Sequence, residues 1–540
     1  MISQCVARIY AASKKYLGIK DVCLYTSLCI FGGIKTILQS SNPCCTSPAL
    51  VSPAPDIENI PPSTIAPTPD SKSPAPVTLL PDVENLFRRY IYDQIPVRLI
   101  LLPEMRLLDR DALISHVRPG MGTITEEAVR TRQNRTPAAT REHVIIDMIR
   151  ERVGYAIFSH RWFSEGEPTY QDMMKGNRLG GAGYEKLKRF CDTAQSARVT
   201  YAWSDTCCIN KDSSSELDES IRSMFRWYRN SFICIAYLGN TDCLDNVGDD
   251  EWFRRGWTLQ ELIAPKCIKF YGRKWNPLTD AVNDLDHWKI LKKVENATTI
   301  RAHFLQGRQF EPGPKDIAER MSWAAGRTTT RGEDRAYSLM GIFGVSMSVA
   351  YGEGPDQAFF RLMEAILHVS NSLDILNWTG VPASTSHATC MLPSSPDCYL
   401  TKNHPKLSAL QNPQSLTLTN RGLQLDLLVI PGELSPETPQ NSNRAIFRPD
   451  RTMVVEDAVA VEGSVESVNK GQSCQYAIGV WNIVQDGVNH SRVVPREMTG
   501  CLMFRFHPSS WKRIPLKEYI KLTPSPKLFH SRLLLERVFL

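Results

Sequence analysis

Four short apolar runs, separated by longer segments with helical spacing, constrain the fold of this 540-residue chain more than any other feature. Each run is almost continuous in apolar residues, as a strand covered on both faces of a sheet requires. The runs are Tyr155 to Phe158, Val199 to Trp203, Phe232 to Leu238 and Cys267 to Tyr271. The alternation is typical of βαβ units and predicts a doubly wound, mostly parallel sheet of the α/β class.

The segments between the runs are predicted to form three crossover helices, because their apolar residues recur every three to four positions. These helices extend from about Tyr184 to Ala194, from Leu217 to Tyr228 and from Trp252 to Ile263. In a sheet of this kind, ligands bind beyond the carboxyl ends of the strands. The residues that follow each run are therefore the candidate site residues.

Polar and reactive side chains follow the first two runs. They are Ser159, His160, Arg161, Trp162, Asp205, Thr206 and Cys207. His160 with Asp205 would suffice for general-base chemistry, and Cys207 would suffice as a thiol nucleophile. The alternative is structural: Ser159 and Asp205 cap the segments after them, His160 is hydrogen-bonded, and Cys207 is a buried, inert thiol.

The third predicted helix carries two further candidates, Trp257 and Glu261. Leu259 and Ile263 lie on one side of this helix, and Glu261 lies off their apolar stripe. A charge in such a position is usually solvated. The residues alone therefore predict that Glu261 lies at the surface.

Cysteine and charge patterns exclude several classes of site. The 15 cysteines contain no C-x-x-C pair and the 11 histidines form no H-E-x-x-H motif, so no metal site is predicted. An odd cysteine count without a secretory leader favours a reducing compartment, and a cytoplasmic location is expected. A net charge of +6 without a long basic block argues against nucleic-acid binding. The apolar run Val22 to Leu38 is too polar and too short for a membrane span.

Composition divides the chain into four regions. Residues 1–82 are predicted to be disordered, with a tether rich in proline and serine from Ser41 to about Pro81. The α/β domain and its lead-in occupy residues 83–275, with a core at 155–271. A mixed helical region follows at 276–380, and a β-rich region at 381–540 ends the chain.

Four separated segments resemble the fungal heterokaryon-incompatibility (HET) domain. They are YAIFSHRW (155–162), YAWSDTCCINKD (201–212), MFRWY (224–228) and RGWTLQELIAP (255–265). The segments RMSWAAGRTTTRGEDRAYSLMGIF (320–343) and YGEG (351–354) resemble the region that follows HET domains in many filamentous-fungal proteins. In that region Arg327, Arg331 and Arg335 would either bind an anion or pair with Glu333 and Asp334, and pairing is the favoured interpretation.

The HET resemblance implies a self/non-self recognition protein that triggers programmed cell death through protein partners or self-association. HET domains are distantly similar to the TIR fold, and AIFSH (156–160) and WTLQEL (257–262) resemble two TIR motifs. This similarity implies a flavodoxin-like sheet. It also implies an alternative function, NAD hydrolysis, with NAD as substrate, Glu261 as the catalytic residue and no other cofactor. A hydrolase that uses Cys207 and His160 is the third alternative.

Overall fold

The computed structural model describes most of the chain after residue 77. The described residues are 78–176, 180–306, 310–383, 389, 391–400, 416–438, 441–450, 459–462, 475–482, 484–485, 492–493, 497–507, 510–525 and 535–540. All of them belong to one structural unit, Ala75–Leu540. The predicted tether lies outside the described residues up to position 77, and the first helix begins at Pro81, two residues before the predicted boundary at Val83.

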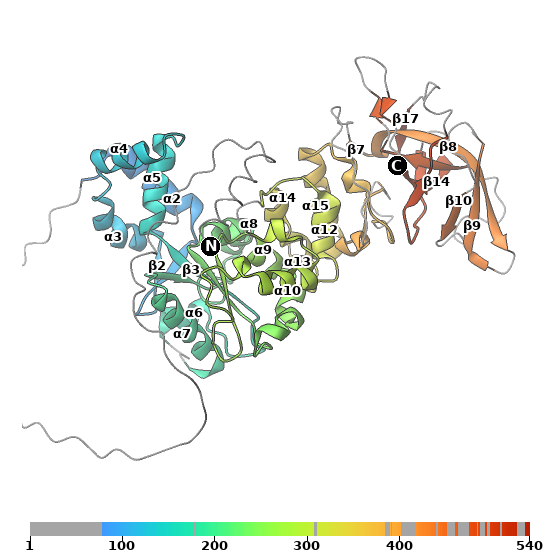
Figure 1. Cartoon of the computed structure of the whole chain (residues 1–540). Helices are drawn as coiled ribbons and strands as arrows, with labels where there is room; N and C mark the ends of the chain where they lie inside the picture. The colour runs from blue at the N-terminus through green and yellow to red at the C-terminus, as the bar shows by residue number, and fades with distance from the viewer. Residues whose placement is uncertain are drawn as a thin grey trace, which may run out of the picture. The chain divides into compact units, whose positions relative to one another are not determined.

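A six-stranded sheet forms the centre of the α/β domain (Figure 1). Its order is β2-β1-β4-β3-β5-β6. The strands are β1 (Arg98–Leu101), β2 (Arg106–Asp109), β3 (Tyr155–His160), β4 (Tyr201–Trp203), β5 (Ile233–Tyr237) and β6 (Ile268–Tyr271). The four predicted runs are the four parallel strands β3 to β6, and the antiparallel hairpin β1-β2 extends the sheet beyond β4. The prediction of a mostly parallel α/β sheet is confirmed.

Helices cover both faces of this sheet. The crossover helices are α7 (Gly181–Ser196), α8 (Ser214–Asn230) and α9 (Thr258–Ile263). Successive side chains of β3 point to opposite faces. Phe158 stacks on Phe190 of α7 with ring centroids 4.3 Å apart, whereas the Tyr155 hydroxyl donates to the Trp227 carbonyl of α8 at 2.5 Å. The domain is therefore doubly wound, as the alternation predicts.

The predicted bounds of the third helix, Trp252 to Ile263, are wrong. A short 3-10 turn, η2 (Glu251–Arg254), comes first, and α9 begins after a break at residues 255–257. The break arises because another segment approaches the backbone at Gly256, whose N–H donates to the Thr328 carbonyl at 2.9 Å. A Cβ at Gly256 would lie 2.5 Å from Thr329 Cγ2, so glycine permits this close approach.

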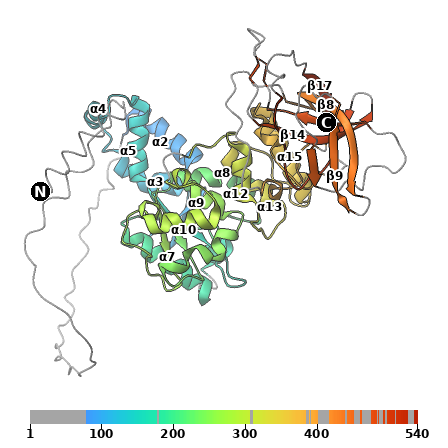
Figure 2. The ribbon, with the colours of Figure 1, turned by 45° about the vertical axis from the view of Figure 1, so that its right-hand side comes forward.

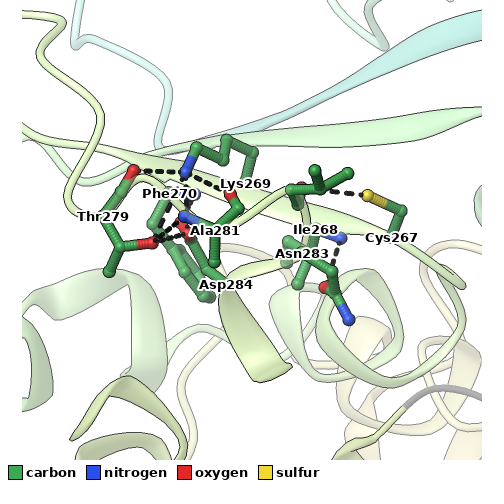
Figure 3. Close-up of polar contacts among 9 residues, drawn as sticks. Cys267, Ile268, Lys269, Phe270, Thr279, Ala281, Asn283 and Asp284 are labelled. Carbon is green, nitrogen blue, oxygen red and sulfur yellow. Dashed lines mark hydrogen bonds and ion pairs between the residues drawn. The ribbon is translucent and has the colours of Figure 1, made fainter. Parts of the chain in front are cut away.

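The edge strand β6 is covered by side-chain oxygens rather than by another strand (Figure 3). The N–H of Ile268 donates to Asn283 Oδ1 at 3.1 Å, and the N–H of Phe270 donates to Asp284 Oδ2 at 2.6 Å. The buried Lys269 ammonium lies 2.9 Å from Asp284 Oδ1 and also donates to the Thr279 carbonyl at 2.5 Å. This arrangement satisfies two backbone N–H groups of β6 that could otherwise pair with another strand.

Two groups of helices flank the parallel strands in the sequence. The first is α2 (Pro81–Gln94), α3 (Arg110–Met121), α4 (Glu126–Arg135) and α5 (Arg141–Arg152), which lie side by side in Figure 1. The second is α10 (Trp288–Thr298), α11 (Ala302–Leu305), α12 (Ile317–Ala324), α13 (Asp334–Tyr337), α14 (Met340–Phe343) and α15 (Pro355–Val369). The second group is the predicted mixed helical region. It packs on the α/β domain, since α14 contacts α8 and the N–H of Val349 donates to Asp218 Oδ1 at 2.9 Å.

Gly341 allows α14 to reach α8, and replacing it with alanine tests that contact. A Cβ at Gly341 would lie 2.2 Å from Phe225 Cβ, so the two helices must separate. We expect Gly341→Ala to lower the free energy of unfolding by about 1–3 kcal/mol. The control is Gly120→Ala in α3, where no atom lies within 4 Å of the added Cβ. Urea denaturation that gave both variants the same midpoint would contradict the predicted contact.

The predicted β-rich region is confirmed. Its main sheet has nine strands and is antiparallel except for one pairing, in the order β10-β9-β8-β11-β14-β15-β17, with β16 on β14 and β7 on β8. These strands are β7 (Thr417–Thr419), β8 (Gly422–Thr438), β9 (Asn441–Pro449), β10 (Val459–Glu462), β11 (Tyr476–Val480), β14 (Met498–His507), β15 (Ser510–Arg513), β16 (Ile520–Leu522) and β17 (Glu536–Phe539); β12 (Val484–Gln485) and β13 (Arg492–Val493) pair separately. Figure 2 shows β8, β9 and β14 of this sheet. Within the described ranges, no helix combines the length and apolar content needed to cross a membrane.

Candidate functional site

Two predicted site residues that are distant in sequence meet inside the α/β domain. Ser159, near the carboxyl end of β3, donates from its hydroxyl to Glu261 Oε2 of α9 at 2.5 Å. The same hydroxyl accepts a hydrogen bond from Trp252 Nε1 at 2.8 Å. The structural alternative expects Ser159 to cap the segment after β3. Ser159 does not do so, because its hydroxyl binds Glu261 and Trp252 instead. It links the central strand to α9.

Glu261 is buried, and the prediction that it is solvated is wrong. Its side chain is 8% exposed, and every residue of α9 is buried because the helix is short and enclosed on all sides. Burial raises the pKa of the carboxyl group from its ordinary value of 4.5 to about 7. The Ser159 hydrogen bond and the Arg255 charge lower this pKa, while the Asp205 charge raises it. Glu261 is thus a carboxyl group that changes charge near neutral pH.

His160 lies on the opposite face of β3 from Glu261. Its ring packs 4.0 Å from that of Phe158, and the side chain is 6% exposed. Neither ring nitrogen has a hydrogen-bond partner among the residues that the structure describes, so His160 is neither hydrogen-bonded nor paired with Asp205 in this state. Burial, followed by the charges of Lys186, Arg255 and Lys211, holds the pKa of His160 well below its usual range. The imidazole is therefore neutral.

The rim beyond the strand ends consists of Arg161, Trp162 and Asp205. Trp162 Nε1 donates to Asp205 Oδ2 at 3.0 Å, and the Lys211 ammonium lies 3.9 Å from the centre of the Trp162 ring. Trp162 is 40% exposed, and the exposed Arg161 forms an ion pair with Glu251. The buried Thr206 hydroxyl lies 2.9 Å from the Ser204 hydroxyl. The rim contains Asp205, but Asp205 does not reach His160 by a hydrogen bond.

The indole N–H of Trp257 is not directed at the Ser159–Glu261 pair. Its indole N–H contacts Asp334 in the following helical region. Trp257 is half-buried and begins the turn that leads into α9. The predicted residue thus links α9 to the helical region.

Cys207 is fully buried, as the inert alternative expects. It lies beside Cys208, whose thiol pKa is raised well above its ordinary value by burial. A thiol nucleophile must be accessible and ionised. We therefore expect iodoacetamide to alkylate the exposed Cys243 in the native protein and to leave Cys207 unmodified until urea unfolds the domain. Peptide mass spectrometry measures both; equal native labelling of Cys207 and Cys243 would revive the Cys-His hydrolase.

The three arginines of the helical region do not form the predicted pairs. Arg335 forms an ion pair with Asp397 at 2.6 Å, and Arg331 lies 4.0 Å from the centre of the Tyr351 ring. Arg327 is buried and donates to backbone and hydroxyl oxygens at the start of α9. The favoured interpretation, in which these arginines pair with Glu333 and Asp334, is therefore wrong. In the folded chain they contact other partners, most of them distant in sequence.

Sequence reasoning missed three residues that shape the Glu261 environment. Trp252 holds Ser159 by its indole N–H, Tyr228 donates to the Phe158 carbonyl at 2.9 Å beside the carboxyl, and Arg327 approaches α9 from residues after α12. Trp252 and Tyr228 lie in apolar stretches that read as core. Burial of Arg327 follows from tertiary packing, which no local pattern encodes.

Comparison with known proteins agrees with three of the four motifs, those at 155–162, 201–212 and 224–228. Residues 155–247 match the family model described as heterokaryon incompatibility protein (HET). The vegetative incompatibility protein HET-E-1 of Podospora anserina is 41% identical over 224 residues, which cover 39% of this chain and 16% of that protein. The chain thus spans about a sixth of the length of this relative. No solved structure matches. The matched segment contains β3, β4, α8 and β5, and ends before Glu261.

Proposed function

We propose that this chain, which carries a HET domain of the kind found in fungal incompatibility proteins, acts in self/non-self recognition and triggers programmed cell death. The observation that carries the proposal is the match of residues 155–247 to the HET family, together with 41% identity to a protein named for vegetative incompatibility. The chain would act in the cytoplasm, through a protein partner or through self-association. Nucleic acid is not a proposed partner.

The geometry of the site is consistent with a signalling module. Ser159 and Glu261 pair with each other and with Trp252 inside the domain, so their polar atoms serve internal contacts. The exposed groups after β3 include the rings of Trp162 and Phe163 and the Arg161 guanidinium. A partner would therefore meet an aromatic and basic rim first, and exposed aromatic and arginine side chains are common at protein interfaces.

We also propose that the sheet of the α/β domain has the flavodoxin-like arrangement of TIR domains. Counted along the chain, the four parallel strands have the spatial order 2-1-3-4, from β4-β3-β5-β6. This order begins the flavodoxin-like arrangement. It supports the TIR-like architecture that AIFSH (156–160) and WTLQEL (257–262) imply.

Expression of the full chain in a filamentous fungus tests the proposed function. The chain is induced with a dimerisation module at its N-terminus, and uptake of a membrane-impermeant dye is scored after the dimeriser is added. We expect dye uptake with wild type and not with Lys269→Met, which disrupts the buried ion pair at β6. Equal viability of induced and uninduced wild-type cells at matched protein levels would refute the proposal.

NAD hydrolysis is the second proposed function, and it remains a prediction. The one feature that bears on it is Glu261, because carboxyl groups with raised pKa values occur at catalytic sites. Against it stands the 8% exposure of Glu261, since a nicotinamide riboside must contact the carboxylate for catalysis. Purified full chain incubated with NAD, with Glu261→Gln as control, decides the matter by release of nicotinamide. Release by wild type and its loss in Glu261→Gln would support hydrolysis at Glu261. Equal release by both forms would exclude Glu261 as the catalytic residue, and no release by either would exclude hydrolysis.

A further inference from the structure

Arg327 connects the helical region to the start of the helix that carries Glu261. Its side chain is 6% exposed. Nε donates to the Trp323 carbonyl at 2.8 Å, while Nη1 donates to the Arg255 carbonyl at 2.9 Å and to Thr258 Oγ1 at 3.3 Å. The last two acceptors lie in the turn before α9 and at its first residue. A residue 80 positions beyond the matched HET segment therefore fixes the first turn of α9.

The second terminal nitrogen of the same guanidinium makes none of these contacts. Arg327 Nη2 is buried and has no hydrogen-bond partner in the described part of the chain. Thr258 and Glu261 are three residues apart on α9, so they lie on one face with Cβ atoms about 5–6 Å apart. Burial lowers the pKa of Arg327 to about 10, and the charge of Glu261 acts in the opposite direction. The two groups therefore interact electrostatically.

We infer that Arg327 is a positioning residue for Glu261: it fixes the first turn of α9 and adds, beside Arg255, a second positive charge that stabilises the Glu261 carboxylate when this group loses its proton. The role concerns the state of the site and does not depend on the proposed part in cell death. A second contact holds the same segment in place, because the N–H of Thr328 donates to the Arg254 carbonyl at 2.8 Å. The functional unit would thus extend past residues 155–247 into the helical region.

Several other groups face the Glu261 carboxyl from the elements around it. They are Ser159 of β3, Asp205 after β4, Tyr228 of α8, Cys234 of β5 and Arg255 before α9. Arg255 is the other positive charge in this set, and it is half-buried, so water screens it in part. Arg327 is the more deeply buried of the two cations, so water screens its charge less.

A double-mutant cycle between Arg327→Met and Glu261→Gln tests this inference. The folding equilibrium constant of the full chain is measured by urea denaturation at about pH 8.5 and about pH 5.5, on either side of the Glu261 pKa. At the higher pH we expect Arg327→Met to reduce the constant at least about tenfold more in wild type than in Glu261→Gln. At the lower pH this coupling disappears, because Glu261 is then protonated.

Arg320→Met is the matched control, because Arg320 is 3% exposed and binds backbone carbonyls of Gly313, Ile342 and Glu311. It should lower stability equally in both backgrounds at both pH values. Three results would overturn the inference. The coupling between Arg327→Met and Glu261→Gln could be absent at about pH 8.5, it could persist unchanged at about pH 5.5, or Arg320→Met could show the same coupling.

Arg327→Lys keeps the test decisive if Arg327→Met does not fold in either background. The lysine keeps the charge but cannot make all three hydrogen bonds. We expect the Glu261 carboxyl carbon, followed by NMR of 13C-labelled protein, to titrate within about half a pH unit of wild type. An upward shift of more than about one unit would show that the charge of Arg327 does not act as inferred. The titration of Glu261 does not depend on whether the protein causes cell death. Failure of this inference can therefore be distinguished from failure of the proposed function.

Discussion

Replacing Lys269 with methionine is expected to lower the free energy of unfolding of the α/β domain by about 3–5 kcal/mol. The Lys269 ammonium lies 2.9 Å from Asp284 Oδ1, and Asp284 is 0% exposed. Without the ammonium, a buried carboxylate keeps its hydrogen bonds from the Phe270 N–H and the Thr279 hydroxyl but loses its counter-charge. The lysine also donates to the Thr279 and Ala281 carbonyls, which lose these donors at the same time.

The control for this prediction is Lys292→Met in α10. Lys292 forms an ion pair with Glu295 at 2.9 Å, but its side chain is 64% exposed, so the change should alter stability by less than about 0.5 kcal/mol. Urea denaturation of the full chain, followed by far-ultraviolet circular dichroism, compares the two variants. A Lys269→Met midpoint as close to wild type as that of Lys292→Met would mean that the buried pair does not hold β6 to the segment after it.

Replacing Glu261 with glutamine is expected to stabilise the protein above neutral pH and to remove a pH dependence. Burial raises the folded-state pKa of Glu261 from 4.5 to about 7. Between these values the folded chain keeps a proton that the unfolded chain releases, so wild-type stability falls as pH rises through this window. The full penalty above the folded pKa is roughly 3 kcal/mol, at about 1.4 kcal/mol per pKa unit.

Glutamine occupies the same volume and can still accept the Ser159 hydrogen bond, but it does not ionise. We expect Glu261→Gln to match wild type at about pH 5 and to exceed it by about 2–3 kcal/mol at about pH 8. Unfolding free energies measured across this range decide the matter, with Glu127→Gln as a control at an exposed position of α4. A Glu261→Gln curve that stays parallel to the wild-type curve would show that Glu261 ionises freely.

The parallel strands could be predicted from the sequence, because each is a continuous apolar run of the length that a two-sided sheet demands. The helices α7 and α8 were predictable for a related reason: both show long, regular apolar spacing. The hairpin β1-β2 could not be assigned, since its antiparallel pairing with β4 joins residues about a hundred positions apart. The break before α9 arises from contact with Thr328, and no local signal marks it.

The candidate site was predictable in its location but not in its contacts. Residues after β3 and β4 do gather at one end of the sheet, as parallel topology requires. The burial of Glu261 was not predictable, because a six-residue helix has its outer face covered by residues after α12 that the local pattern does not reveal. The structural roles of Trp252 and Arg327 were not predictable either, because both depend on contacts between residues distant in sequence. Trp252 binds Ser159 within the α/β domain, and Arg327 acts across the interface between this domain and the helical region.

The most direct test of the account compares wild type with Glu261→Gln in fungal cells, at matched protein levels and with the dimerisation module in place. NAD content and dye uptake are followed together after induction. The proposed signalling role predicts that both forms kill and that NAD does not fall before membranes become permeable. The contrary result is that wild type loses NAD early and kills the cells, while Glu261→Gln does neither. That result would contradict a purely signalling role and identify the domain as an NAD-consuming enzyme.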